Sequence, residues 1–151
     1  MQYWLFKTEP STYSIDDLKR EKKTEWYGIR NYQVRNFLRD TIASGDQVLI
    51  YHSNTKELGV VGIAEVASDA YPDTEQFKTK SQYFDPKSKK DKPTWLSRDI
   101  KFVEKFKRVV TLDELKRHSA LKNMLILRRG NRLSITPLTK NEFLYISTLA
   151  R

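Results

Sequence analysis

The sequence has no cysteine and only two histidines among its 151 residues. Disulfide bridges and thiolate metal sites are therefore excluded. His52 and His118 stand far apart in the chain and make a poor metal-ligand set, so we expect no metal and no cofactor. The lack of cysteine is compatible with a reducing compartment. We expect an intracellular protein, cytoplasmic or, in a eukaryote, nuclear.

Long hydrophobic runs and several familiar motifs are also absent. No stretch approaches the ~18 consecutive apolar residues of a membrane-spanning helix, so no contact with a membrane is expected. The first ten residues lack a basic region, a long apolar run and a cleavage site of small residues, and we interpret them as a first strand rather than a signal peptide. The chain has no P-loop, no G-x-G-x-x-G and no G-x-S-x-G, the motifs of nucleoside triphosphate sites, dinucleotide sites and serine hydrolases.

Positive charge is plentiful, and it is concentrated in the second half of the chain. Residues 1–75 carry 9 Lys and Arg against 12 Asp and Glu, whereas residues 76–151 carry 19 against 7. The net charges of the two halves are therefore −3 and +12. Such asymmetry predicts a polyanionic partner, and together with an aromatic content of 12% it favours nucleic acid. The plainer alternative is a protein with a basic surface and no such partner.

Periodicity and capping residues predict a single α+β domain over residues 1–151. Strands are expected from short apolar or alternating runs at residues 2–7, 46–52, 59–67, 99–110 and 132–137. Helices are expected after Ser14, over 31–43, after Thr111, over 120–127 and after Thr139. Residues 72–94 hold three prolines and six lysines and predict a long exposed loop. Because strands do not alternate strictly with helices, we expect a mixed, barrel-like sheet flanked by helices.

Two dense segments predict a binding pocket. Residues 45–54, GDQVLIYHSN, read as a buried strand that emerges into Tyr51, His52 and Ser53, and concave sites are often built at such strand ends. Residues 26–31, WYGIRN, add Trp26. Together with Tyr13 and Trp95, these aromatic rings are candidates to stack on a planar ligand, and their alternative role is ordinary core packing.

Polar residues near the pocket candidates also have two interpretations. Arg30 and Asn31 open a predicted helix, whose free N–H groups can meet an anion or a polar ring edge; alternatively, Asn31 only caps the helix. Lys7 and Glu9 leave the first strand on the same side. They can serve acid–base chemistry or bind a ligand edge, or they can form an exposed ion pair of little energetic value.

Two basic groups are candidate phosphate contacts, which supply affinity without identifying a base. They are Lys87, Lys89 and Lys90 of the lysine-rich loop, and Arg128, Arg129 and Arg132. The alternative is a solvated surface that only keeps the protein in solution. No catalytic residue is expected, because the adjacent His52 and Ser53 point to opposite faces of a strand and make a poor nucleophile–base pair.

The motifs occur together in one order along the chain. They are WLFKTEPSTYS at 4–14, WYGIRNYQVRNFLR at 26–39, GDQVLIYHSN at 45–54, VVGIAEV at 60–66, AYPD at 70–73, the Trp95 region and RLSITP at 132–137. Over nearly the whole chain this set resembles the EVE domain family. The resemblance implies a PUA-like fold, similar in architecture to YTH and ASCH domains. It also implies a reader of modified bases in DNA or RNA that holds a flipped base in a pocket.

Carried onto this sequence, the resemblance implies a specific set of pocket residues. They are Lys7, Glu9, Pro10, Trp26, Gly28, Arg30, Asn31, Tyr51, His52, Ser53, Trp95 and Ser134. The two tryptophans are expected to stack on the base. Its polar edge is expected to meet Glu9, Asn31 and Ser53, and its sugar-phosphate or exocyclic group is expected to meet Lys7, Arg30 and His52.

The hypothesis is a non-enzymatic module that binds nucleic acid carrying a modified cytosine or adenine. Two alternatives stay open. Some ASCH-type relatives resemble amidohydrolases that strip an acyl group from a modified nucleoside, and here Lys7 and Glu9 would carry that chemistry. The other alternative is a general RNA-binding module that is indifferent to base modification.

Overall fold

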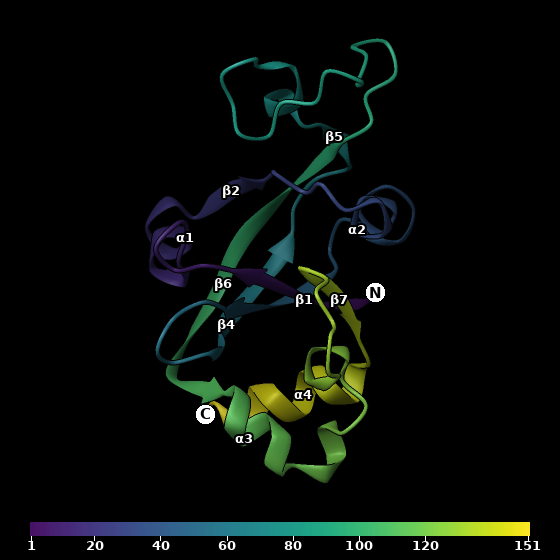
Figure 1. The fold of residues 1–151 in the computed structure, drawn as a ribbon. Coiled ribbons are helices and arrows are strands. Elements are labelled where there is room, and N and C mark those ends of the chain that lie inside the picture. Colours follow the sequence, from purple (N-terminus) through teal and green to yellow (C-terminus); the bar gives the residue numbers. More distant parts are fainter.

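The computed structural model describes all 151 residues and has one mixed sheet with helices on both of its faces (Figure 1). The strands are β1 (Tyr3–Thr8), β2 (Lys23–Trp26), β3 (Gln47–His52), β4 (Gly59–Val66), β5 (Tyr71–Pro72), β6 (Leu96–Thr111) and β7 (Ile135–Leu138). Their order is β2-β6-β4-β3-β1-β7, and β5 pairs with β6. Only β1 and β3 run parallel; every other pair is antiparallel. The predicted α+β class is confirmed.

The helices begin where their capping residues predict. They are α1 (Ile15–Glu21), α2 (Tyr32–Asn36), α3 (Leu112–Arg117) and α4 (Lys140–Leu149), with a π-helix η1 (Phe37–Thr41) and 3-10 turns η2 (Thr74–Phe77), η3 (Ser119–Leu121) and η4 (Leu125–Leu127). Reciprocal capping boxes start α1 at Ser14 and α4 at Thr139. None of the helices has the length and apolar character that a membrane span requires.

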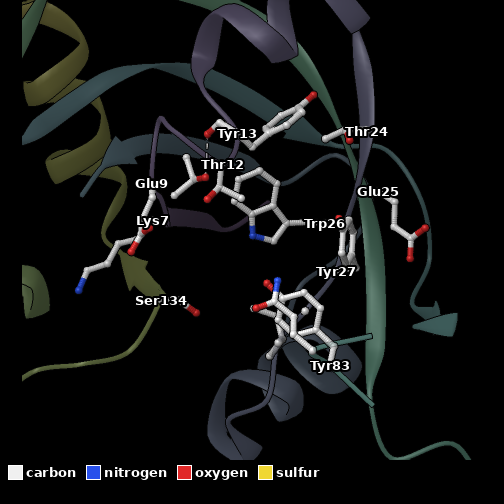
Figure 2. A pocket seen from close by; sticks show the side chains of 14 residues that line it. Lys7, Glu9, Thr12, Tyr13, Thr24, Glu25, Trp26, Tyr27, Tyr83 and Ser134 are labelled. Atoms are coloured by element: carbon white, nitrogen blue, oxygen red, sulfur yellow. Dashed lines mark hydrogen bonds between the residues drawn. The ribbon is translucent and has the colours of Figure 1, made fainter. Parts of the chain in front are cut away.

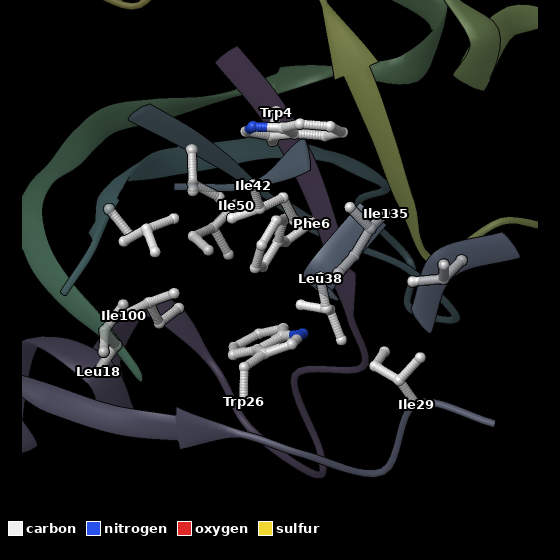
Figure 3. Packing of buried hydrophobic residues seen from close by; sticks show 14 of the residues in the cluster. Trp4, Phe6, Leu18, Trp26, Ile29, Leu38, Ile42, Ile50, Ile100 and Ile135 are labelled. Atoms are coloured by element: carbon white, nitrogen blue, oxygen red, sulfur yellow. The ribbon is translucent and has the colours of Figure 1, made fainter. Parts of the chain in front are cut away.

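Both faces of the sheet are buried, and this explains the continuous apolar runs of its strands. Along β1, Trp4 and Phe6 join one core cluster while Leu5 joins the other, because successive side chains point to opposite faces. α1, α2 and η1 cover the first core, and α3, η3 and α4 cover the second. Trp26 from one edge strand and Ile135 from the other both reach the first core (Figure 3). The sheet is therefore curled, and its two open edges approach each other.

Some predicted elements differ in the structure. The strand expected at 132–137 begins only at Ile135, the helix expected at 120–127 is replaced by the turns η3 and η4, and the edge strand β2 was not predicted. At the helix expected after Thr111, the Thr111 hydroxyl accepts from the Glu114 N–H, but the Glu114 carboxylate binds Arg108 at 2.6 Å and does not return to the cap. β2 escapes prediction because only its last residue, Trp26, is buried.

Residues 72–94 were predicted as an exposed loop, and this was wrong for the start of the segment. Asp73 and Gln76 are completely buried. The Gln76 amide nitrogen donates to the carbonyls of Asp73 and Trp95 at 2.7 and 2.8 Å, and its oxygen accepts from the Ser88 hydroxyl at 2.6 Å. The segment is therefore organised by buried polar side chains, which leave no periodic signal in a sequence. Its lysines remain exposed, as predicted.

Candidate functional site

A cavity of about 490 Å³ opens between the two edges of the curled sheet (Figure 2). The end of β1, the strand β2 and the segment before β7 form its walls. It is lined by Lys7, Thr8, Glu9, Thr12, Tyr13, Thr24, Glu25, Trp26, Tyr27, Gly28, Ile29, Gln82, Tyr83 and Ser134. This volume lies within the ~300–1,000 Å³ of typical small-molecule pockets.

Aromatic rings form the walls of this pocket. The Trp26 indole packs on Phe6 at 5.6 Å and meets the Tyr13 ring edge-on at 6.2 Å, and only 9% of the residue is exposed. The Trp26 Nε1 has no hydrogen-bond partner in the protein. Since every buried polar side-chain atom has a partner, this nitrogen is not buried, and it is accessible to a ligand as a donor. Figure 2 shows Trp26 between Tyr13 and Tyr83. Tyr27, which is 51% exposed, meets Tyr83 edge-on at 5.9 Å at the mouth.

Polar groups surround the aromatic slot. Lys7 is partly buried, and this burial lowers the pKa of its ammonium group. The Lys7 backbone N–H donates to the Ser134 carbonyl at 2.8 Å and joins two walls. Burial and then a hydrogen bond to Glu21 raise the pKa of Tyr13 to about 12, so its phenol stays neutral at physiological pH. The pocket therefore offers donors and acceptors around a flat space, and nowhere in the chain do three His, Asp or Glu side chains gather in a metal-binding arrangement.

Tyr83 is held in the pocket wall by Arg30, which lies behind it. Arg30 Nε and Nη2 donate to the Tyr83 carbonyl at 3.0 and 2.8 Å. Arg30 Nη1 donates to Asp73 Oδ2 at 3.0 Å, and the same oxygen accepts from the Gly28 N–H at 2.8 Å. Asp73 is completely buried, so these charge-assisted bonds are strong constraints. Arg30 is therefore a positioning residue for the pocket.

Gly28 allows the Tyr83 ring to lie against the backbone. Its φ is +83°, a conformation that residues with a side chain rarely adopt. A Cβ atom at this position would stand 2.9 Å from the ring carbon Cζ of Tyr83. Both the turn and the close approach therefore require glycine.

The family model for the EVE domain matches residues 2–149. The chain belongs to the EVE domain family. It is similar to thymocyte nuclear protein 1 of Homo sapiens, with 43% identity over 166 residues that cover 97% of this chain and 73% of that protein. A solved protein from Pseudomonas syringae shares 43% identity at a TM-score of 0.94 over 99% of both chains. Human THYN1 protein, solved in complex with DNA containing 5-methylcytosine, shares 40% identity at a TM-score of 0.92 over 100% of this chain and 98% of that chain.

Five of the twelve predicted pocket residues line the pocket of this EVE domain. They are Lys7, Glu9, Trp26, Gly28 and Ser134. Arg30 does not line the pocket, but it holds Tyr83 in the pocket wall by donating to the Tyr83 carbonyl. The contacts of these residues with a ligand remain predictions.

The other six predicted residues lie outside the pocket lining, and several have structural partners. Asn31 caps α2 by accepting from the Val34 N–H at 3.0 Å. Trp95 is 4% exposed and donates to Asp85 at 2.8 Å. The remaining four are Pro10, Tyr51, His52 and Ser53.

The order of strands in the sheet keeps three residues at the end of β3 away from the pocket: Tyr51, His52 and Ser53. β1 pairs with β3 on one side and with β7 on the other, so β1 separates the end of β3 from the pocket. Tyr51 is 3% exposed in the second core, and His52 Nε2 accepts from the Ile15 N–H at the start of α1. The Ser53 N–H donates to the Thr8 carbonyl. The end of β3 therefore lies one strand away from the pocket, and the contact of its residues with a ligand stays a prediction.

Tyr27 and Tyr83 were not predicted for the pocket. Tyr27 directly follows Trp26, and Tyr83 lies with Phe84 among the lysines of the 72–94 segment. Aromatic residues interleaved with lysines are a signal for nucleic-acid binding, and this signal points to Tyr83.

The six predicted phosphate contacts are all exposed and form no ion pair within the chain. Two of them stand close to pocket residues along the chain. Arg132 lies two residues before Ser134, and Lys87 lies four residues after Tyr83. At ~3.5 Å per residue both can reach a ligand that leaves the pocket. Their contact with phosphate remains a prediction.

Replacing Gly28 by alanine should displace Tyr83 and destabilise the fold. The comparison is Gly45→Ala, since Gly45 has a φ of +95° but no atom within 4 Å of the position that a Cβ atom would take. Both variants lose ~1–2 kcal/mol to the left-handed backbone, but only Gly28→Ala also clashes. Denaturant unfolding should show a larger loss in the free energy of unfolding for Gly28→Ala than for Gly45→Ala. When each substitution is made together with Tyr83→Ala, the two losses should be equal. Equal losses for the two single variants would contradict the contact.

His52 should make stability depend on pH. Burial lowers its pKa, and its Nε2 must be unprotonated to accept from Ile15. The unfolded chain therefore takes up the proton first, so the free energy of unfolding should fall as pH decreases below about 6.5. His52→Gln retains an acceptor but does not titrate, and it should flatten this part of the curve.

Proposed function

We propose that this EVE domain binds nucleic acid and reads a modified base, with 5-methylcytosine in DNA as the first ligand to test. The observation that carries the proposal is the aromatic pocket between the sheet edges. The proposal is also supported by a relative that shares 40% identity over the full chain and was solved with DNA containing 5-methylcytosine. With such a ligand, we infer a site of action inside the cell, in the cytoplasm or in a nucleus.

The shape of the pocket favours a base that has left the helical stack. A base inside a duplex presents only its groove edges, whereas this pocket is lined by the aromatic rings of Trp26, Tyr27 and Tyr83, which suit the face of a whole base. Proteins that must enclose a whole base extrude it and hold it between aromatic or apolar side chains. The cost of extrusion is a few kcal/mol, and aromatic stacking at ~1–3 kcal/mol per base is of the same size.

The polar residues of the pocket are suited to a ring with an exocyclic amino group. Carboxylates accept from the N4 amino group of cytosine, and Glu9 and Glu25 both line the cavity. Glu25 Oε2 already accepts from the Ser97 hydroxyl at 2.8 Å, which holds that side chain in one orientation. Lys7 supplies a cation toward the sugar-phosphate. We assign stacking to Trp26 and edge recognition to Glu9, with Ser134 as a further polar contact.

The amidohydrolase alternative has little support. An ASCH protein from Zymomonas mobilis shares 14% identity at a TM-score of 0.59, a likeness that concerns the fold alone. Burial is the one influence on the pKa of Lys7, so Glu9 does not act on its ammonium group. A general RNA-binding module differs from a reader in being indifferent to the modification, and a titration with modified and unmodified strands distinguishes the two.

Fluorescence anisotropy should show that the wild-type chain binds a methylated strand more than tenfold tighter than an unmodified one. Matched single-stranded and duplex oligonucleotides, each with cytosine or 5-methylcytosine at one position, are compared at fixed salt. Trp26→Ala should lose more than tenfold in affinity for the methylated strand. Trp26→Leu, which keeps apolar packing against Phe6 but has no ring to stack on a base, should lose affinity while the chain stays folded. Equal affinity for both bases in every strand would end the reader proposal. A loss under twofold for a folded Trp26→Ala would end the stacking role.

Replacing Lys87, Lys89 and Lys90 by glutamine should weaken binding to all sequences alike. Each lost phosphate contact reduces counterion release, so the slope of log affinity against log salt should flatten by about 2 on single-stranded DNA. The matched control removes the same charge from Lys116, Lys122 and Lys140, which are exposed at the opposite end of the molecule, near α3 and α4 (Figure 1). A loss that depends on the base would contradict the phosphate role, and so would equal slopes for the two triple variants.

A further inference from the structure

Exposed aromatic residues gather beside the pocket. Four aromatic residues of the chain are large and exposed: Tyr27, Tyr32, Phe84 and Tyr145. The first three belong to two segments, residues 27–32 and 83–84, which Arg30 and Asp73 tie together. Only Tyr145 lies elsewhere, on α4. The aromatic surface therefore continues outward from the pocket instead of ending at its rim.

A stacked series of side chains leads from the pocket to Tyr32. The Arg30 guanidinium lies 5.3 Å from the Tyr83 ring and 5.4 Å from the Trp95 ring. The Trp95 ring in turn lies 4.9 Å from the Tyr32 ring, with 36° between their planes. Tyr83 lines the pocket, and Tyr32 is separated from it by two stacked groups. Tyr32 is thus positioned relative to the pocket by rigid contacts and not by a flexible loop.

Tyr32 is ordered and open at the same time. Its ring is supported by Trp95, and the Arg35 guanidinium lies 5.1 Å from its centroid. Arg35 is itself fixed by donating to the Thr94 carbonyl at 2.9 Å. Even so, 60% of Tyr32 is exposed. An aromatic ring held in place while most of it faces solvent loses little further entropy when a ligand stacks on it.

Charge on the same surface identifies the class of ligand. Residues 78–92 carry six lysines and two aspartates, a net charge of +4, and Arg35 adds a cation beside Tyr32. Aromatic platforms combined with a positive surface are what single-stranded nucleic acid requires, because bases stack while phosphates pair with cations. An apolar protein partner would leave these charges without complement.

We propose that Tyr32 is a stacking platform for an unpaired base on the strand that runs out of the pocket. The proposal rests on the proposed function, since it assigns the pocket to one nucleotide of the same strand. A paired base in a duplex has its faces covered by its neighbours, so a base that stacks on the exposed part of Tyr32 must be unpaired beside the modified base. The EVE domain then prefers a single-stranded or locally melted ligand to an intact duplex.

The experiment scans abasic sites through a single-stranded oligonucleotide that carries 5-methylcytosine. An abasic nucleotide removes one base but retains every phosphate, so charge is constant. For the wild type, one abasic position outside the pocket nucleotide should weaken binding about tenfold. For Tyr32→Ala that position should have no effect, and Tyr32→Phe, which keeps the ring, should behave as the wild type. Tyr145→Ala is the matched control and should also behave as the wild type.

The outcomes separate the two proposals. If 5-methylcytosine binds more tightly than cytosine but no abasic position matters, the platform is overturned and the pocket stands. If an abasic position costs affinity equally in wild type and Tyr32→Ala, a different residue holds that base and the platform is also overturned. If methylated and unmodified strands bind alike, the reader function is overturned, and the abasic scan with wild type and Tyr32→Ala alone decides the platform. A duplex that binds more tightly than the matched single strand contradicts the stated preference.

Discussion

The buried carboxylate of Asp73 is the constraint on which the site depends. A carboxylate with no exposure to solvent must be fully hydrogen-bonded, and Asp73 accepts from the N–H groups of Gly28 and Glu75 and from the Arg30 guanidinium. These bonds tie the connection between β2 and α2 to the segment that follows β5. Through Arg30 they hold Tyr83 in the pocket wall. Removing one partner of such a buried pair typically costs ~3–5 kcal/mol, so the constraint is not easily exchanged.

The pocket exists because the sheet curls without closing. Its edge strands β2 and β7 contribute Trp26 and Ile135 to one core, yet they do not pair with each other. The space between them is walled by the end of β1 and covered by side chains from the connecting segments. Trp26 belongs to both the core and the pocket, because one part of its indole packs on Phe6 and its nitrogen faces the cavity. The residue proposed to stack on the base is therefore also a core residue, and the pocket wall that it forms is a rigid part of the core.

Local signals in the sequence predicted local structure well. The capping boxes at Ser14 and Thr139, the buried strand before His52 and the alternating strand β6 all appear where their patterns place them. Each depends on neighbours within a few residues, which the sequence displays directly. The edge strand β2 and the buried polar residues at the start of residues 72–94 were missed. Their stability comes from partners far along the chain, such as β6 for β2 and Trp95 for Gln76.

The sequence by itself determined the strand and helix periods, the basic second half and, through its ordered motifs, the EVE domain family. Tertiary structure alone decided which candidate residues meet. It turned His52 toward the start of α1, placed Arg30 behind Tyr83 and brought Tyr83 across to Trp26. The physical reason is that the strands that supply one site are paired in the sheet in an order that differs from their order along the chain. A pattern of neighbouring residues reports the face of a strand, whereas the sheet order decides what lies beside it.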